Sequence, residues 1–586
     1  MPMFPVEEIN AQSMKTCYFL NIPWRFPNLF CSEYLLTSRL NTSLLVNVDS
    51  RGINMIASKR IIGSVLLAAC WFCRASFAAE AIDHEVIAAI KEEGIQHSQA
   101  METLSYLTDI HGPRFAGTPG YFRAAEWARQ QLNDWGLDAH LEAYPVDYLG
   151  WGILSHSVEM TSPRYMRLSA VPAPWASSTA EVSGELIQLQ FDDLEALKKY
   201  EGQLNGKILI LPAEVEAGYE DDGYDEYDFD ADLHKMTQAL KPSMSNPGDE
   251  SDERISEYLQ DWPNQEKEYR DKSREIIAWL KQEKVAALLE GTTLAFGVIG
   301  AKNGSALIMD SPENSLPHLI LSREHHGRLL RTMEKGIPAT VKLSLSTHYY
   351  DQPKYHSNVI AEIKGSHRNK RDELVLVGAH FDSWQTGTGA SDNAFGSVVM
   401  MEALRILKTL DLKMDRTVRI GLWGGEEQYY DGSAAYAREH FGTVIDSNDF
   451  KDAQAKISLY LNLDNGSDKI RGVYLQGNEK IRGFFADNLA PFSYLGANHV
   501  SAMSGGGTDH IIFDDLNIPA FQLIQGSQEG PPVSTHHSSM DLYEFVDEEA
   551  MIQNAVIMAS LIYHAATRDE LLPRKRLQPP IQGEKQ

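Results

Sequence analysis

Short apolar runs that end at glycine or at a charged residue recur in the second half of the chain. Three of them are Leu374–Val377, Val418–Trp423 and Ile457–Leu463. Runs of this length, rich in β-branched residues and followed by glycine or a charge, are typical of strands buried on both faces. The pattern therefore predicts three buried strands in this half of the chain.

The stretch between the first two runs has a helical period. Within residues 394–410, apolar residues recur at positions Val398, Met401, Leu404 and Leu407. A strand, a helix and another strand in this order predict parallel strands with crossover helices. Residues 121–136 predict a further amphipathic helix that ends at Gly136. We therefore expect an α/β fold with a mixed, largely parallel sheet flanked by helices.

Carboxylates and imidazoles gather at the ends of the predicted strands. They are His380 and Asp382 after the first run, Asp392 before the helix, Glu426 and Glu427 after the second run, Asp464 after the third, and His537 after a later run at Ala520–Ile524. Ligands collect at the rim where parallel strands end. Two histidines with several carboxylates suit Zn²⁺, and Mn²⁺ or Co²⁺ less well. The set predicts a two-metal hydrolase.

Each of these residues also has a structural interpretation when taken alone. Asp392 suits the cap of the helix that follows, and a single histidine is more often packed or on the surface than a ligand. The pair Glu426 and Glu427 suits a solvated face. Five such coincidences at successive strand ends are implausible, and the metal site is the better hypothesis.

Four segments carry a resemblance to a known family. They are "GAHFDSWQTGTGASDNAFG", "GLWGGEEQYYDGSAAY", "NLDNGSDKIRGVYLQGNE" and "HHSSMDLY". They resemble the co-catalytic zinc aminopeptidase and glutamate carboxypeptidase family, and within it the plasma glutamate carboxypeptidases and their bacterial relatives. The similarity runs from about residue 85 to about residue 567, with one insertion. It implies the zinc exopeptidase fold, peptide substrates and two Zn²⁺ per chain.

The resemblance also implies a role for each candidate residue. His380 and Asp464 would hold one metal, Glu427 and His537 the other, and Asp392 would bridge the two. Glu426 would be the general base, and Asp382 would orient His380. A cis peptide is implied between Asp392 and Asn393.

The chemistry of such a site is consistent with these roles. A water between two metal ions is acidic enough to give hydroxide near neutral pH, and Glu426 can take its proton and return it to the leaving amine. Two dications would lower the pKa of Glu426 while burial would raise it, so the sequence leaves the net shift open. Asp382 can accept the second N–H of His380, although it also suits a plain turn residue.

Polar residues beyond the ligand set are further candidates. His536 stands where membrane-bound relatives have a tyrosine, and we expect it to donate a hydrogen bond to the tetrahedral intermediate. The alternative is a bystander in an exposed loop. By resemblance, residues 504–513 line the substrate pocket, with Asp509 and His510 as polar supports rather than ligands.

The N-terminal region resembles an export signal. Lys59 and Arg60 precede an apolar stretch and small residues, which predicts a signal peptide at 55–79 cut after Ala78, and hence a periplasmic or extracellular protein. Alternatives are a membrane anchor, disfavoured by the short stretch, and a lipoprotein anchored through Cys70. Residues 1–54 stay unexplained. All four cysteines precede the cut, so no disulfide is expected after it.

The remaining chain divides into a peptidase domain and an insert. Residues 80–147 predict the first part of the peptidase domain and residues 348–570 its catalytic part, with a C-terminal tail at 571–586. Between them, residues 148–347 resemble a protease-associated insert, with strands expected at "GELIQLQ", "GKILILP", "AALLEG" and "AFGVIG". Within the insert, the acidic tract 219–234 predicts a surface loop rather than a calcium site. A later polar stretch, 246–280, has enough apolar residues to form helices.

The length and net charge of the chain limit the number of domains and the kinds of partner that we expect. The 586 residues allow two domains, and the net charge of −28 argues against nucleic acid and anionic membranes as partners. We expect an exported di-zinc aminopeptidase or dipeptidase without a stable membrane span after processing, with a homodimer left open. A glutamate-type carboxypeptidase is the alternative within the fold, and a catalytically inactive receptor-like binding protein is the alternative outside enzymes.

Overall fold

A computed structural model describes residues 82–146, 148–189, 194–214, 229–239, 271–300, 312–351, 353–443, 449–526 and 535–575. The chain separates into two compact units, Met1–Phe77 and Ala78–Gln586, and every described residue belongs to the second unit. The predictions for the N-terminal region lie outside the described residues. They are the signal peptide, its cleavage after Ala78, the lipoprotein alternative at Cys70 and the unexplained extension at 1–54. Among the described residues, no helix combines the length and the apolar character needed to cross a bilayer.

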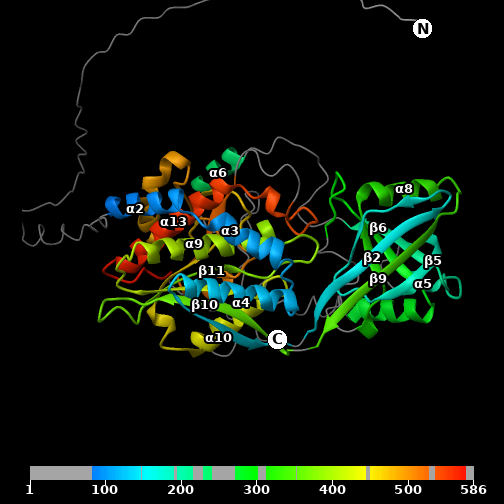
Figure 1. The fold of residues 1–586 in the computed structure, drawn as a ribbon, viewed down its shortest axis with the longest axis horizontal. Coiled ribbons are helices and arrows are strands. Elements are labelled where there is room, and N and C mark those ends of the chain that lie inside the picture. Colours follow the sequence, from blue (N-terminus) through cyan, green and yellow to red (C-terminus); the bar gives the residue numbers. More distant parts are fainter. Residues whose placement is uncertain are drawn as a thin grey trace, which may run out of the picture. The chain divides into compact units, whose positions relative to one another are not determined.

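The predicted peptidase domain is built on an eight-stranded mixed sheet (Figure 1). Its strands, in spatial order, are β1 (Asp138–Pro145), β10 (Tyr355–Ile363), β12 (Thr417–Trp423), β11 (Leu374–His380), β15 (Ile457–Asn462), β18 (Ala520–Gln525), β16 (Ile470–Tyr474) and β17 (His499–Ser501). The central four, β12 to β18, run parallel to one another, and antiparallel pairs flank them. This confirms the predicted fold class and the three buried strands.

Strand register brings the predicted site residues to one rim. His380 pairs with Trp423, and Gly378 pairs with Asn462. The residues that follow β11, β12 and β15 therefore emerge side by side at the carboxyl ends of the parallel strands.

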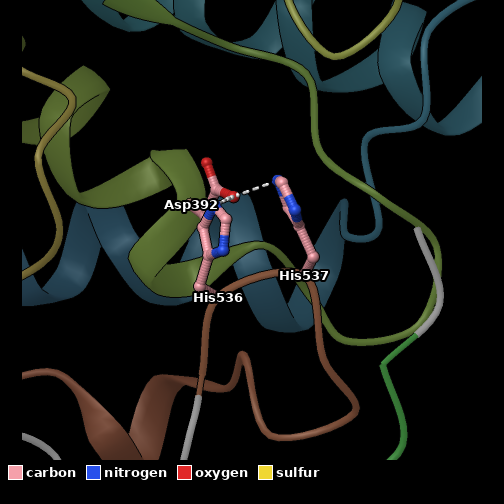
Figure 2. A group of neighbouring side chains, drawn as sticks. All are labelled: Asp392, His536 and His537. Carbon is pink, nitrogen blue, oxygen red and sulfur yellow. Dashed lines mark ion pairs between the residues drawn. The ribbon is translucent and has the colours of Figure 1, made fainter. Parts of the chain in front are cut away.

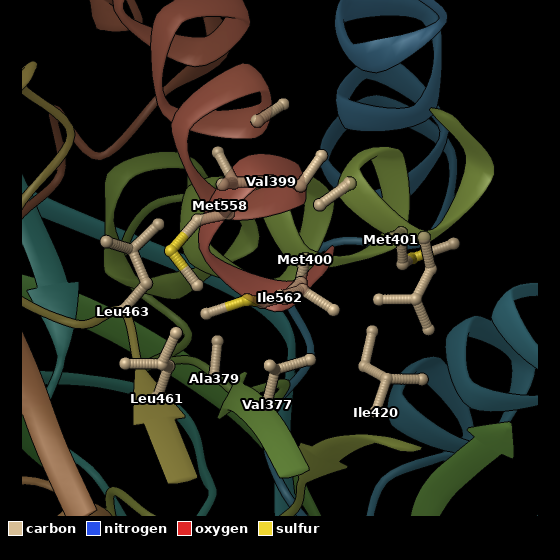
Figure 3. Close-up of a cluster of buried hydrophobic side chains, with 14 of the residues drawn as sticks. Val377, Ala379, Val399, Met400, Met401, Ile420, Leu461, Leu463, Met558 and Ile562 are labelled. Carbon is tan, nitrogen blue, oxygen red and sulfur yellow. The ribbon is translucent and has the colours of Figure 1, made fainter. Parts of the chain in front are cut away.

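Helices cover both faces of this sheet. On one face lie α2 (His84–Gln96), α3 (Ala100–Ser105), α9 (Phe395–Thr409) and α13 (Glu548–Thr567); on the other lie α10 (Asp431–His440) and α12 (His510–Asp515). Figure 3 shows Val377 and Ala379 of β11 packed beneath Met400 of α9 and Ile562 of α13. Side chains alternate along β11, so Leu376 joins the second core on the opposite face.

Local sequence signals account for the remaining helices of this domain. The helix α4 (Pro119–Asp134) begins at the capping residue Thr118 with a proline in its first turn. It ends before Gly136, whose φ of +86° confirms the predicted cap. The other elements are two π-helical turns, Tyr106–Ile110 and Ala390–Ala394, α11 (Arg482–Leu489), β13 (Gly442–Thr443), β14 (Asp449–Phe450) and short 3₁₀ turns.

A second eight-stranded sheet occupies the region predicted as an insert. Its strands, in spatial order, are β3 (Met166–Arg167), β2 (Gly150–Ser162), β9 (Thr340–Tyr350), β5 (Thr179–Gln188), β6 (Ile208–Glu214), β7 (Ala287–Thr292), β8 (His318–Leu321) and β4 (Ala170–Pro172). The helices α5 (Leu194–Lys198) and α8 (Arg323–Met333) accompany it, and residues 271–282 are also helical. Gly150 at the start of β2 pairs with Tyr350 at the end of β9. The first and last strands of the insert are therefore neighbours, and the chain enters and leaves the insert at adjacent points. Its identification as a protease-associated domain stays a prediction.

Two expectations within the insert are wrong. Residues 295–300 form a turn rather than a strand, because Phe296 and Gly297 adopt φ values of +61° and +77° that break strand geometry. The end of the acidic tract is the helix α6 (Phe229–Gln238) rather than a loop. Phe229, Leu233 and Met236 recur at helical spacing there and are buried. The tract's earlier residues, 219–228, lie outside the described part of the chain.

Candidate metal centre

His380, Asp392 and Asp464 form one half of the site. His380 is the last residue of β11, Asp392 lies between β11 and α9, and Asp464 follows β15. The His380 Nε2 atom lies 3.0 Å from Asp392 Oδ1 and 3.5 Å from Asp464 Oδ1. The structure therefore brings together the three residues assigned to the first metal.

Glu427 and His537 form the other half around the second oxygen of Asp392. The His537 Nε2 atom lies 2.9 Å from Asp392 Oδ2 and 3.1 Å from Glu427 Oε2. Figure 2 shows His536 and His537 facing Asp392 from one loop. Asp392 thus presents its Oδ1 atom to His380 and its Oδ2 atom to His537.

The spacing and chemistry of these atoms fit a pair of metal ions. Ligands at about 2.0–2.2 Å from a tetrahedral Zn²⁺ lie about 3.3–3.6 Å apart. The separation of 3.5 Å falls in this range, and those of 2.9, 3.0 and 3.1 Å lie slightly below it. Glu427 Oε1 is buried, and none of the residues that the structure describes donates a hydrogen bond to it. A buried carboxylate oxygen without a donor is costly unless a cation or water meets it. The donor set and its geometry therefore fit Zn²⁺.

The turn that carries Glu426 and Glu427 is fixed by its main chain. The Glu426 and Glu427 N–H groups donate to the two Asp382 carboxylate oxygens, at 3.1 and 3.3 Å. Gly424 has no room for a side chain, because a Cβ atom there would lie 2.0 Å from Tyr121 Oη. Gly425 has a φ of +71°, which favours glycine. The two glycines of Gly-Gly-Glu-Glu therefore shape the turn that carries the candidate residues Glu426 and Glu427.

Asp382 contacts both ligand segments. Its main-chain oxygen lies 3.1 Å from His380 Nδ1, while its carboxylate lies 3.7 Å from that atom. The closer partner of the imidazole is therefore the carbonyl, and the carboxylate instead accepts the N–H groups of Glu426 and Glu427. Asp382 thus connects the end of β11 to the turn after β12.

The Asp392 segment is held by its own neighbours. The Asp392–Asn393 peptide is cis, as predicted. The Asn393 side chain donates to the Leu463 carbonyl at 2.9 Å and accepts from the Gly396 N–H at 2.9 Å. Asn393 therefore connects the Asp392 segment to the residue that precedes Asp464.

The histidines and the central carboxylate shift one another's proton affinity. Burial acts to raise the pKa of Asp392, but His537 and His380 lower it well below its usual range. Burial acts to lower the pKa of His537, but Glu427 and Asp392 raise it to about 9. For His380 burial again lowers the pKa, and Asp464 and Glu426 raise it well above its usual range. These mutual shifts mark a cluster of opposite charges out of water.

Glu426 lies in the most anionic part of the cluster. Burial raises its pKa well above the usual range, and Asp464, Asp509 and Glu427 add to the rise, while His380 opposes it. Asp509 behaves similarly, with burial raising its pKa to about 7. Positive charge at the ligand atoms would reverse this repulsion and ionise Glu426.

Two predicted accessory residues differ in burial. His536 is 55% exposed, its Nε2 atom lies 3.7 Å from Asp392 Oδ2, and its ring lies 3.6 Å from that of His537. His510 is fully buried, with its Nε2 atom 2.9 Å from Gln476 Nε2 and 3.1 Å from the Gly505 carbonyl. Through these contacts the His510 side chain helps to hold the main chain of residues 504–513 in place.

Sequence reasoning missed two residues that hold the ligand segments. Asp541 accepts hydrogen bonds from the Ser391 N–H and hydroxyl, at 2.5 and 2.7 Å, directly before Asp392. Arg114 is fully buried and donates to the carbonyls of Phe381, Thr388 and Gly389. Asp541 stood within the motif "HHSSMDLY", but no pattern in the sequence connects Arg114 to ligands so far along the chain.

Comparison with known proteins supports the same interpretation. Residues 358–562 match the model of Peptidase family M28. Carboxypeptidase Q of Mus musculus is 25% identical over 488 residues, covering 82% of this chain and 88% of that protein. Aminopeptidase YwaD of Bacillus subtilis is 25% identical over 283 residues, covering 47% of this chain and 58% of that protein.

Solved structures share the fold. A peptidase M28 precursor from Shewanella amazonensis has a TM-score of 0.59 at 21% identity, covering 84% of this chain and 98% of its own. A zinc aminopeptidase from Bacillus subtilis has a TM-score of 0.50 at 18% identity, covering 80% and 95%. The predicted resemblance and the predicted fold are thus both confirmed. By its motifs, its fold and its match over residues 358–562, the chain is a metallopeptidase similar to those of peptidase family M28.

Proposed function

We propose that the chain is an exported di-zinc exopeptidase that removes N-terminal residues from peptides or splits dipeptides. His380 and Asp464 would hold one zinc ion, Glu427 and His537 the other, and Asp392 both. One observation carries the assignment: each oxygen of Asp392 faces a different histidine, at 3.0 and 2.9 Å. Export rests on the predicted signal peptide.

The remaining residues have roles in moving protons and stabilising charge. When bound, zinc would supply Lewis acidity and would lower the pKa of the attacking water. Glu426 accepts the proton of that water and returns it to the departing amine. His536, exposed beside Asp392, donates to the oxyanion of the tetrahedral intermediate.

The charge of the site favours a substrate amine over a substrate carboxylate. Among the described residues, the main charges acting on Glu426 and Glu427 come from other carboxylates and from His380 and His537. The buried Arg114 directs its N–H groups at main-chain carbonyls. A carboxypeptidase needs a cation to hold the terminal carboxylate, and an aminopeptidase needs acceptors for an ammonium group.

A substrate panel tests this proposal. Dipeptides, aminoacyl-anilides and N-blocked peptides are incubated with purified protein, before and after chelation and after zinc is restored. We expect release of N-terminal residues that chelation abolishes and zinc restores. Cleavage of N-blocked peptides from the C-terminus would instead establish the carboxypeptidase, and zinc binding without any hydrolysis would establish the inactive binding protein.

Replacing the proposed base separates catalysis from metal binding. Glu426→Gln removes the proton acceptor but no proposed ligand, so kcat should fall by about 10²–10⁴-fold while the zinc content stays at two. Glu427→Gln is the matched control, because it removes a proposed ligand from the adjacent position and should lower the zinc content. Wild-type kcat in Glu426→Gln would exclude the proton-transfer role.

A further inference from the structure

Arg114 is fully buried and donates to four main-chain carbonyls, three of them between the candidate ligands His380 and Asp392. Its Nε donates to Phe381 at 2.7 Å, its Nη1 to Leu107 at 3.2 Å and Thr388 at 2.9 Å, and its Nη2 to Gly389 at 2.8 Å. Three of these acceptors lie within residues 381–389, the segment that joins His380 to Asp392. The guanidinium therefore binds the segment near its start, at Phe381, and near its end, at Thr388 and Gly389.

We propose that Arg114 is a positioning residue that sets the separation of His380 and Asp392 by fixing the main chain between them. The inference deepens the proposed function, since it concerns the ligands of the same centre. Arg114 is not itself a ligand, because a guanidinium has only N–H donors and no acceptor for a cation. It acts through the segment rather than on substrate.

Neighbouring contacts fix this segment to Arg114 more closely. The Arg114 N–H donates to Ser383 Oγ at 3.1 Å, and the Ser383 N–H donates to the Arg114 carbonyl at 3.3 Å. At Gly389, a Cβ atom would lie 2.2 Å from Ser383 Cβ and 2.9 Å from Arg114 Nη2. The segment thus follows the arginine so closely that a single methyl group has no place between them.

The charge of Arg114 also suits this place. Burial lowers its pKa to about 10, so it stays protonated at neutral pH, with Asp541, Asp382 and Asp392 as the surrounding anions. Burying a guanidinium is unfavourable unless its donors are satisfied, and neutral carbonyls accept four hydrogen bonds from it here. A buried cation is thus a costly way to gain stability alone, but a planar fork with five donors is well suited to fixing several carbonyls at once.

Arg416 offers a matched control. It is also buried, at 1% exposure, and donates to the carbonyls of Arg568 and Asp569. It precedes β12, at the end of the strand opposite to Glu426, and pairs with Glu373 at 2.8 Å. Arg416→Met therefore removes another buried guanidinium that donates to main-chain carbonyls, without touching residues 381–389.

The test compares Arg114→Met, Arg114→Lys and Arg416→Met in the full chain. Zinc affinity is measured by competition with a chromophoric chelator, and Co²⁺ absorption spectra report the ligand geometry. Exchange of the amide hydrogens of residues 381–391 is followed in the metal-free proteins. Both Arg114 variants should bind zinc about 10–100-fold more weakly, with altered Co²⁺ spectra and faster exchange in that segment. Arg416→Met should lose stability while zinc affinity, spectrum and segment exchange stay at wild-type values.

Each outcome bears on the inference. Folded Arg114→Met with wild-type affinity, spectrum and exchange would overturn it. Wild-type behaviour of Arg114→Lys would also overturn it, because charge alone would then suffice. If Arg114→Met fails to fold, Arg114→Lys carries the comparison. The proposed function fails separately, if wild-type protein binds zinc but hydrolyses no peptide, and the exchange measurement needs neither metal nor substrate.

Discussion

At the scale of single residues, most side chains of the centre serve two neighbours at once. Asp392 faces two histidines, and Asp382 accepts N–H groups from both glutamates while lying 3.7 Å from His380 Nδ1. A change at one such residue therefore affects two segments. The sequence identified Asp382 because it follows an apolar run and Asp392 because it precedes a predicted helix, and both signals are local to the chain.

Asp382→Asn tests the role of the shared carboxylate. An asparagine can accept one of the two N–H groups but presents its own amide to the other, so the turn after β12 should shift. Zinc affinity is expected to fall by about 10–100-fold, measured by chelator competition. The exposed Asp411→Asn is the control and should bind zinc normally. Unchanged affinity in Asp382→Asn would show that the carboxylate is dispensable.

His536→Gln tests the proposed oxyanion donor. Loss of the imidazole should lower kcat by about 10²-fold with little change in KM, because the interaction forms mainly in the transition state. His536 also lies with Asp392 and His537 in a group able to hold a metal ion. A lower zinc content in this variant would identify it as a ligand instead, and unchanged kcat would exclude the donor role.

At the scale of elements, the start of β10 contains a buried histidine unrelated to the ligand set. His356 is 1% exposed, and the rings of Tyr121, Tyr144 and Tyr148 surround it. Burial lowers its pKa to about 4, against a smaller opposing effect of Asp382. The folded chain thus keeps this imidazole neutral where an unfolded chain would protonate it.

This burial predicts acid sensitivity of the fold. Between pH 6.5 and 4 the unfolded chain binds more protons at His356, so the free energy of unfolding should fall as pH falls, by up to about 1.4 kcal/mol per pH unit. His356→Phe removes this contribution, and urea unfolding at pH 7 and pH 5 should show a smaller loss than in wild type. The exposed His97→Phe should keep the wild-type dependence. An equal loss in His356→Phe would contradict the prediction.

The elements also show where sequence patterns succeed. Strands β11, β12 and β15 and the helix α9 followed from apolar periodicity, because burial on one or both faces imposes that period. The turn at Phe296 did not, since its left-handed backbone is selected by tertiary contacts: the Ile299 carbonyl accepts from Ser539 N–H at 2.9 Å. The role of Arg114 could not be predicted from the sequence for a similar reason. Its partners are main-chain carbonyls, which every residue type has, so no sequence pattern identifies them.

At the scale of the whole molecule, the insert contacts the peptidase sheet through α6. Phe229 is 5% exposed and belongs to a buried cluster with Tyr474 and Met503, and Arg471 pairs with Asp230 at 2.9 Å. The Met236 carbonyl accepts from Ser501 Oγ at 2.6 Å. The acidic stretch around α6 is thus partly built into the fold, and its charge lies beside a basic residue of β16.

Phe229→Ala tests this contact. Removing a buried ring from such a cluster costs about 3–5 kcal/mol, which should release α6 from β17 before the sheet itself unfolds. Amide exchange across residues 229–238 should accelerate strongly, while that of β11 and β15 stays slow. Phe296→Ala, at a 67% exposed ring, makes the same chemical change on the surface and should leave α6 protected. Slow exchange of α6 in Phe229→Ala would show that the polar contacts suffice.

The centre is assembled from segments spread along nearly the whole described chain, from Arg114 through His380 to the loop of His537. During synthesis the chain therefore carries only the half of the site made of His380, Asp392 and Asp464 until the loop of His537 has been added, and a truncated product lacking that loop has no second histidine. We therefore expect binding of a second zinc ion to mark molecules in which this late loop has packed against Asp392 and Glu427.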